Sequence, residues 1–159
     1  MKKIKRKFTF VTLIVIFLIF IDQGTKILVF LEKDKIESGI RIFNFFNIVY
    51  VENRGISFGI FSSYDASFYL GILSFLISAY IIFIIKLTHE LWEIIGLSLI
   101  LGGALGNGLD RVINNYVIDF FDFHYNNLHW PAFNFADSFI TIGGLIFFWR
   151  IFFKKPEKK

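Results

Sequence analysis

Long apolar runs separated by short polar stretches dominate the pattern of the chain. Four of these runs approach the length of about 20 mostly apolar residues that a helix needs to cross a bilayer. They cover residues 8–31, 68–85, 91–109 and 135–153. The second run contains no charged residue, whereas the first contains Asp22 and Lys26 in its second half. The pattern predicts four transmembrane helices.

Two less apolar segments, residues 32–66 and 111–134, follow the first and third runs. The first segment contains IRIFNFFNIVYVENRGISFGIF, which is rich in β-branched and aromatic residues and is interrupted at Asn53-Arg54-Gly55. This composition indicates two short strands around a turn. The predicted fold is therefore an all-α integral membrane protein of four transmembrane helices, with a small extracytoplasmic β-element between helices 1 and 2. Without repeats or linkers, residues 1–159 are predicted to form a single membrane domain.

The composition leads to the same class of protein. Hydrophobic residues make up 55% of the 159 residues and charged residues only 19%. A soluble domain of this size leaves a large share of its chain exposed to water, so it does not bury that much apolar surface. The start of the chain resembles a secretory signal but lacks a small-residue cleavage site, which indicates a retained span. Cysteine is absent, and this excludes disulfides and thiol chemistry.

The positive charge lies mainly at the two ends of the chain. Nine of the 17 Lys and Arg residues fall in MKKIKRK at the start and KKPEKK at the end. Basic tails often bind nucleic acid, but beside apolar runs they mark the cytoplasmic side of a membrane. We therefore expect both termini and the link at residues 86–93 in the cytoplasm, residues 32–66 and 111–134 outside, and no nucleic-acid partner.

This topology places the costly polar residues of the spans in one layer. Charges inside a bilayer are rare, and each is a candidate for a functional site. The four-span order brings a set of them to the outer end of the helices: Asp22, Lys26, Asn107, Asp110, Arg111, Asn134 and Asp137. Asp119, in VIDFFDF, lies in the outer segment just before the last span. Convergence at one depth indicates a site, because scattered packing devices would not share it.

Purely structural roles are also open for several of these residues. Asp22 and Lys26 are four residues apart on one helical face and can form an ion pair that holds the first span to its neighbours. A small-residue face at Gly102, Gly103 and Gly106 would let another helix approach closely. Asn134 and Asp137 have the spacing of a capping box at a helix start, where the helix amino end also favours a charged carboxylate.

Three chemistries remain open for such a site. A zinc site would draw on His124 and His129 in a loop with Asp122, although no HExxH-type spacing is present. A Ser–Lys pair would use Ser57 or Ser138 with Lys26 as the base, but a neighbouring Asp22 would keep Lys26 charged. Two aspartates in a low-dielectric pocket share one proton, which suits amide hydrolysis.

The aspartate pair is the preferred chemistry, with Asp119 and Asp137 as catalytic residues and without a metal or other cofactor. The ionised carboxylate would take a proton from water while the protonated one polarises a carbonyl. No pattern in the sequence brings Asp119 next to Asp137, 18 residues further on. The main alternative from another class is a small membrane transporter or proton channel with an acidic relay. A structural membrane scaffold, which would tolerate loss of both aspartates, is a third.

Five sequence blocks in order resemble the lipoprotein signal peptidase (signal peptidase II) family, bacterial intramembrane aspartic proteases. They are DQGTK (22–26), ENRGISFG (52–59), GGALGNGLDR (102–111), VIDFFDF (117–123) and WPAFNFADSFITIG (130–143). The resemblance covers nearly the whole chain. Gly108 and Phe135 depart from it, since a branched aliphatic residue is usual there.

The resemblance implies both a reaction and a set of site residues. Asp119 and Asp137 correspond to the catalytic dyad, and the other matching motif positions are Asp22, Lys26, Asn53, Gly55, Asn107, Asp110, Arg111, Asn134 and Ala136. The implied reaction removes signal peptides from prolipoproteins by cutting before a diacylglyceryl-modified cysteine. It further implies inhibition by globomycin-type peptides, contact with membrane lipids, and a place in the bacterial cytoplasmic membrane with the active site towards the outer leaflet.

Overall fold

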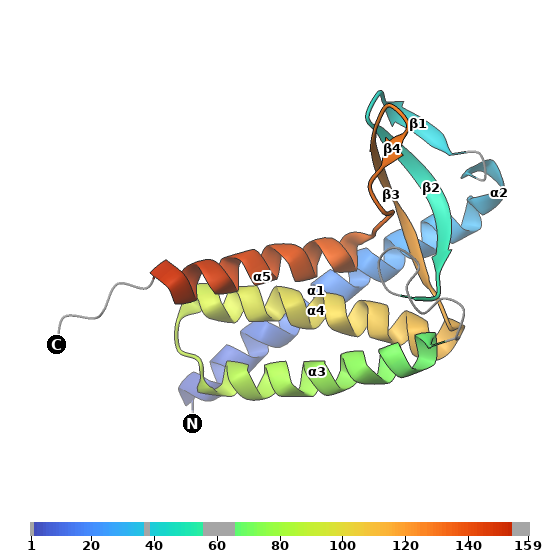
Figure 1. Ribbon diagram of the computed structural model, residues 1–159. Helices are drawn as coiled ribbons and strands as arrows, with labels where there is room; N and C mark the ends of the chain where they lie inside the picture. The colour runs from blue at the N-terminus through green and yellow to red at the C-terminus, as the bar shows by residue number, and fades with distance from the viewer. Residues whose placement is uncertain (1, 37–38, 56–65, 154–159) are drawn as a thin grey trace.

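Four long helices form a bundle in the computed structural model, which describes residues 2–36, 39–55 and 66–153 (Figure 1). They are α1 (Lys2–Leu31), α3 (Ser67–Leu87), α4 (Leu91–Asn114) and α5 (Phe135–Phe153). Each is long and apolar enough to cross a membrane. The four predicted spans are confirmed as helices, although α1 begins at Lys2 instead of residue 8 and α4 continues to Asn114 instead of residue 109.

The helix α4 lies at the centre of the bundle, where it packs against α1, α3 and α5. In the most apolar stretch of α4, 61% of the residues are buried inside the protein. The corresponding share is 22% in α1, 22% in α3 and 11% in α5. Glycines allow this central position because a side chain would collide with the neighbouring helices. A Cβ atom at Gly102 would lie 2.8 Å from Leu18 of α1, and one at Gly103 would lie 2.3 Å from the carbonyl oxygen of Ala136 in α5.

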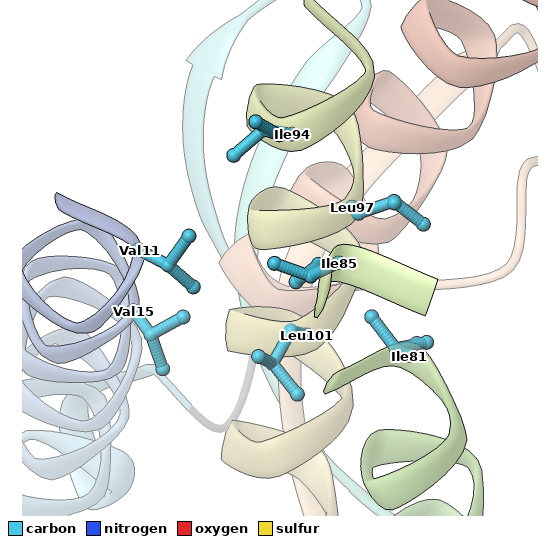
Figure 2. Close-up of a cluster of buried hydrophobic side chains, with 7 residues drawn as sticks. All are labelled: Val11, Val15, Ile81, Ile85, Ile94, Leu97 and Leu101. Atoms are coloured by element: carbon cyan, nitrogen blue, oxygen red, sulfur yellow. The ribbon is translucent and has the colours of Figure 1, made fainter. Parts of the chain in front are cut away.

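A cluster of buried aliphatic side chains joins α1, α3 and α4 (Figure 2). Its members are Val11, Val15, Ile81, Ile85, Ile94, Leu97 and Leu101. The outward faces of the same helices expose large apolar side chains such as Phe20, at 75%. In water this exposure would be unfavourable, whereas lipid covers it without cost, so the surface agrees with a membrane-embedded bundle.

A basic side chain ties the end of α3 to the start of α1. The Lys7 ammonium group donates to the backbone carbonyls of Ile85, Lys86 and Thr88, at 2.8, 2.9 and 2.9 Å. The carbonyls of Ile85 and Lys86 lack partners within their own helix because a helix leaves its last four carbonyls free, and Thr88 follows the helix as its C-cap. The charge of Lys7 also suits the negative end of the helix dipole.

A small antiparallel sheet lies at the opposite end of the bundle from the start of α1 and the end of α5 (Figure 1). We call these the sheet end and the terminal end. The strands run in the order β1 (Ile40–Phe43), β2 (Phe46–Asn53), β3 (Val117–Tyr125) and β4 (Leu128–His129). A four-residue helix, α2 (Lys33–Ile36), precedes β1.

The predicted β-element between helices 1 and 2 is confirmed, but it is only half of the sheet. The strands β3 and β4 come from residues 111–134, where no strand was predicted. The turn within the first half lies at Asn44 and Phe45, before the predicted break at Asn53-Arg54-Gly55, where β2 ends instead. The second strand expected after that break falls at residues 56–65, outside the described residues.

Candidate active site

The return of the chain from β3 brings Asp119 close to the start of α5. After β4 the backbone runs back along β3, and the N–H groups of Phe120 and Phe121 both donate to the carbonyl of Phe133, at 3.1 and 2.9 Å. Phe133 in turn donates to the carbonyl of Phe121 at 3.2 Å. Since Phe133 is fixed beside the middle of β3, the following residue, Asn134, reaches Asp119 directly. This pairing supplies the proximity that no sequence pattern predicted.

Two asparagine side chains bind the carboxyl group of Asp119. Asn53, at the end of β2, donates to Oδ2 at 2.8 Å. Asn134 donates to Oδ1 at 2.6 Å. Asp119 is only 2% exposed, so these donors satisfy an acceptor group that water reaches poorly.

Asp137, in the first turn of α5, receives a different pair of donors. Asn107 of α4 donates to its Oδ1 at 2.8 Å, and the backbone N–H of Asn134 donates to its Oδ2 at 3.2 Å. The backbone N–H of Asp137 donates to Asn134 Oδ1 at 3.0 Å. The two reciprocal bonds between Asn134 and Asp137 form the predicted capping box. Asn134 therefore caps α5 and binds Asp119 at the same time.

The orientation of each asparagine amide is fixed by a donor to its oxygen. The Asn53 oxygen accepts the backbone N–H of Gly55 at 3.0 Å, and the Asn107 oxygen accepts the Lys26 ammonium at 2.8 Å. The Asn134 oxygen accepts the cap bond from Asp137. Because an amide has its oxygen and its NH₂ on opposite sides, each NH₂ group must face an aspartate. The site thus presents fixed donors to both carboxyl groups.

A buried cluster of charged side chains holds the side chain of Asn107 in place. The Lys26 ammonium donates to Asp22 Oδ2 at 2.7 Å and to Asp110 Oδ2 at 2.6 Å, as well as to Asn107. Lys26 is 3% exposed and Asp22 is fully buried. With three acceptors, all three protons of the ammonium are used, so the cluster holds a charged lysine in place. The predicted Asp22–Lys26 pair is confirmed, and it joins α1 to α4.

Two further contacts link this cluster to the rest of the site. Asp22 Oδ1 accepts the backbone N–H of Ala136 at 3.0 Å, which ties the start of α5 to α1. Arg111 donates to the carbonyl of Gly55 at 3.2 Å. Gly55 is thereby held where its N–H orients Asn53. All eleven residues predicted for the dyad and its surroundings lie in this one connected region.

Gln23 belongs to the same region, although it was not among the predicted site residues. Its side-chain nitrogen lies 3.1 Å from Asp110 Oδ1, 3.2 Å from Asp22 Oδ2 and 3.3 Å from the carbonyl oxygen of Gly106. Gln23 lies three residues before Lys26 on the same side of the helix, and this spacing could have predicted that it joins the cluster. Gln23 adds a donor to a cluster that has two carboxylates and one ammonium.

Both aspartates line a cavity of about 590 Å³. Asn53 and Arg111 also line it, together with apolar residues before and along α5 that include Trp130, Phe133 and Ile142. A cavity with apolar walls and a few converging polar groups is the usual form of a site for a small or extended ligand. This cavity is therefore the candidate active site.

The pKa of Asp119 is raised from its ordinary value to about 7. Burial is the main cause, since it disfavours the charged form, and the negative charge of Asp137 adds to it. The hydrogen bonds from Asn53 and Asn134 act in the opposite direction but do not cancel the effect. Near neutral pH, Asp119 can therefore hold a proton beside a second carboxyl group.

Among the residues of the competing chemistries, Asp122, His129 and Ser138 form hydrogen bonds with groups outside the dyad. His129 Nδ1 lies 2.8 Å from Asp122 Oδ1, and the ring of His124 stacks on His129 with centroids 5.0 Å apart. These histidines line a separate hollow of about 350 Å³, and no set of three or more potential ligands for a metal ion occurs in the described part of the chain. The Ser138 hydroxyl donates to the carbonyl of Asn134 at 2.9 Å. Ser57 lies outside the described residues.

Known proteins with similar sequences include lipoprotein signal peptidases from several bacteria. A sequence model of the signal peptidase (SPase) II family matches residues 14–153. The lipoprotein signal peptidase of Thermodesulfovibrio yellowstonii is 45% identical over 142 residues, which are 87% of this chain and 92% of that protein. The lipoprotein signal peptidase of Aeromonas hydrophila is 39% identical over 127 residues, covering 77% of this chain and 76% of that protein.

The fold has a solved counterpart as well. A bacterial membrane enzyme determined by the in meso method at 2.3 Å resolution superposes with a TM-score of 0.83, at 29% sequence identity. The superposition covers 95% of this chain and 94% of that one. The fold, the polar site and the match over residues 14–153 agree: the chain belongs to the signal peptidase II family of membrane peptidases.

Proposed function

We propose that this chain is an intramembrane aspartic endopeptidase that removes signal peptides from diacylglyceryl-modified prolipoproteins, cutting before the lipidated cysteine. The observation that carries the proposal is the pair of carboxyl groups, Asp119 and Asp137, on one cavity with fixed amide donors around them. The name shared by the relatives supports the substrate class. The family resemblance adds globomycin-type peptides as expected inhibitors.

In the proposed mechanism the two aspartates have different roles. Asp119, with its pKa of about 7, holds the proton and donates a hydrogen bond to the scissile carbonyl oxygen. Asp137 accepts one proton from a water molecule as the water oxygen bonds to the carbonyl carbon. The tetrahedral intermediate then collapses, the C–N bond breaks, and the leaving nitrogen takes a proton from the dyad. Two groups with separated proton affinities suffice for this chemistry.

The proposed mechanism uses no metal. The four carboxylate oxygens of the dyad already accept hydrogen bonds from Asn53, Asn107 and Asn134. Each oxygen keeps a second lone pair, which the proposed mechanism uses for a proton or a water molecule. Lys26 and Ser138 are likewise held by other partners.

The dyad is tested by replacing each aspartate with asparagine. A carboxamide neither accepts a proton as a base nor shares one, so Asp119→Asn and Asp137→Asn should each lower cleavage by at least about 10²-fold, the lower bound of a general acid–base contribution. The assay follows a purified diacylated prolipoprotein, and thermal unfolding in detergent checks that each variant is folded. Ser138→Ala and added chelator are the controls, and both should leave the rate unchanged.

The outcomes separate the competing functions. Near-normal turnover in either asparagine variant would refute the dyad. Activity lost in chelator and restored by zinc would favour a metal site instead. Failure of the wild-type protein to cut the precursor, together with proton flux in proteoliposomes, would favour a transporter.

Recognition of lipid is tested by comparing precursors with and without the diacylglyceryl group. Each buried CH₂ contributes about 0.8 kcal/mol to membrane attachment, so the lipid keeps the bond next to the cysteine within the bilayer, at the depth of the site. We expect the diacylated precursor to be cut far faster than the unmodified one at equal concentration in one detergent. Equal rates would indicate a general signal-peptide protease.

A further inference from the structure

A second cavity, of about 440 Å³, lies at the terminal end of the bundle. It is lined by Trp92 in the first turn of α4 and by Leu145, Ile146, Trp149 and Arg150 near the end of α5. Four of these five side chains are apolar or aromatic. We call this cavity the terminal groove.

The terminal groove continues the active-site cavity along α5. Ile142 lines the first cavity and Leu145, less than one helical turn later, lines the second. Ile142, Leu145 and Trp149 are 50%, 67% and 64% exposed, so this face of α5 is not covered by the described part of the chain. The opposite face packs on α4, where Gly143 meets the backbone of Gly96. An uncovered apolar track therefore leads from the dyad to the terminal end.

The length of this track matches the apolar part of a signal peptide. Asp137 and Trp149 are 12 residues apart on one helix, which corresponds to about 18 Å at 1.5 Å per residue. The apolar region of a signal peptide has about 7–15 residues, or about 10–22 Å as a helix. A signal peptide that is cut at the dyad would thus have the start of its apolar region beside Trp92 and Trp149.

The charges at the groove favour an apolar ligand over a charged one. Arg150 donates to the Glu90 carboxylate at 3.1 Å, so the two charges at this end offset each other. Two exposed indole rings remain, Trp92 at 56% and Trp149 at 64%. Tryptophan is typical of the level where the apolar core of a membrane meets its headgroups.

We propose that the terminal groove binds the signal peptide's apolar segment, with Trp92 and Trp149 contacting the residues where that segment begins. This inference rests on the proposed function, since it extends recognition from the cleaved bond to the far end of the same peptide. A lipid acyl chain is the competing ligand. The peptide is favoured because its other end is bound at the dyad, which gives its apolar segment a high effective concentration at the groove.

Cross-linking tests the proposal directly, because the chain has no native cysteine. Trp149→Cys is combined with Asp137→Asn, so that a bound precursor stays intact. The diacylated precursor carries one free cysteine about 12 residues before the cleaved bond, the distance that α5 spans between the dyad and the groove. We expect an oxidative cross-link from position 149. Phe148→Cys is the control, because Phe148 is 58% exposed but does not line the groove.

Kinetics give a second, independent readout in the active protein. Trp149→Ala should raise KM for the diacylated precursor about tenfold with kcat unchanged, as expected for a contact made equally in the bound and transition states and worth about 1.4 kcal/mol. Phe148→Ala should leave both constants unchanged. A diacylated precursor that lacks the first half of its apolar segment should be cut by wild type and Trp149→Ala with equal KM.

Each negative result would contradict a different part of the proposal. The wild type could cut the precursor normally while the cross-linking variant forms no cross-link at position 149, or cross-links equally at positions 148 and 149. Either result would refute peptide binding in the terminal groove and leave a lipid as its ligand. An equal rise in KM for the full and shortened precursors would show that Trp149 acts through the fold. If wild type fails to cut the diacylated precursor at all, the proposed function itself is wrong.

Discussion

Three asparagines surround the aspartates, and each has its oxygen bound by a donor from elsewhere in the chain. Gly55 orients Asn53, Lys26 orients Asn107, and the backbone of Asp137 orients Asn134. A donor that is oriented before the reaction does not have to reorganise as charge develops. The buried Lys26 cluster is thus linked to the proposed dyad through Asn107, and among the described residues Lys26 forms no hydrogen bond with Asp119 or Asp137.

The raised pKa of Asp119 predicts a fall in activity on the alkaline side. Because the folded-state pKa is about 7, Asp119 is mostly protonated at pH 6 and mostly ionised at pH 8. In the proposed mechanism the ionised form would not donate a hydrogen bond to the scissile carbonyl. We expect kcat/KM for a diacylated precursor to decrease as the pH rises through about 7. Asn53→Leu removes a hydrogen bond that lowers this pKa, so it should shift the midpoint upwards.

A profile that stays flat from pH 6 to 8 would contradict this assignment. A downward shift of the midpoint in Asn53→Leu would contradict the role of the Asn53 hydrogen bond. Unfolding measured over the same pH range separates a change in chemistry from a loss of structure.

Among the elements, α4 and α5 set the geometry of the site. The backbone of Gly103 in α4 lies against the carbonyl of Ala136 in α5, and Gly106 lies against the carboxylate of Asp22. The capping box fixes the first turn of α5 within this contact. Asp137 therefore keeps its position because its helix starts at a defined residue and touches α4 without intervening side chains.

Replacing Gly103 with alanine should disturb both stability and cleavage. The added Cβ would lie 2.3 Å from the Ala136 carbonyl oxygen, so α5 must move away from α4. Overpacking of this kind costs about 1–3 kcal/mol, and the displaced Asp137 should lower kcat. Gly144→Ala on α5 is the matched control, since nothing lies within 4 Å of a Cβ there.

Thermal unfolding in detergent and cleavage of a diacylated precursor measure the two effects. Gly144→Ala should retain both properties of the wild type. Equal behaviour of Gly103→Ala and Gly144→Ala would show that α4 and α5 have more room to separate than their close contact indicates.

The whole molecule separates its polar site from its terminal end. The sheet lies at one end of the bundle, whereas the start of α1 and the end of α5 lie at the other (Figure 1). The cavity is lined by residues of β2, β3 and the first turn of α5, so it lies at the sheet end as well. Basic residues flank the terminal end in the sequence. By the positive-inside rule we expect this end to face the cytoplasm and the site to face the outer leaflet.

The orientation predicts the labelling of single cysteines in intact cells. His89→Cys, in the link between α3 and α4, should be protected from a membrane-impermeant maleimide, whereas Lys35→Cys in α2 and Asn127→Cys between β3 and β4 should react. All three react once the membrane is permeabilised, which controls for exposure of the thiol. Reaction at position 89 in intact cells would overturn the four-span topology and the outer position of the site.

The sequence by itself determined the features that depend on local composition. The four helices followed from apolar runs of sufficient length, and the capping box at Asn134 and Asp137 followed from residues three apart. The pairing of Asp22 with Lys26 followed from helical spacing in the same way. The roles of Asp119 and Asp137 remain predictions until the variants are measured, although the family of the chain agrees with them.

Tertiary structure alone decided which distant groups meet. Asp119 reaches the start of α5 because Phe133 pairs with Phe121, and the sheet takes its second half from residues 117–129 because β3 pairs with β2. Gln23 joins the charge cluster because α4 approaches α1. These contacts depend on backbone pairing and helix packing between segments far apart in the chain. The local spacing of residues predicts helices and strands but does not predict which distant segments pack together.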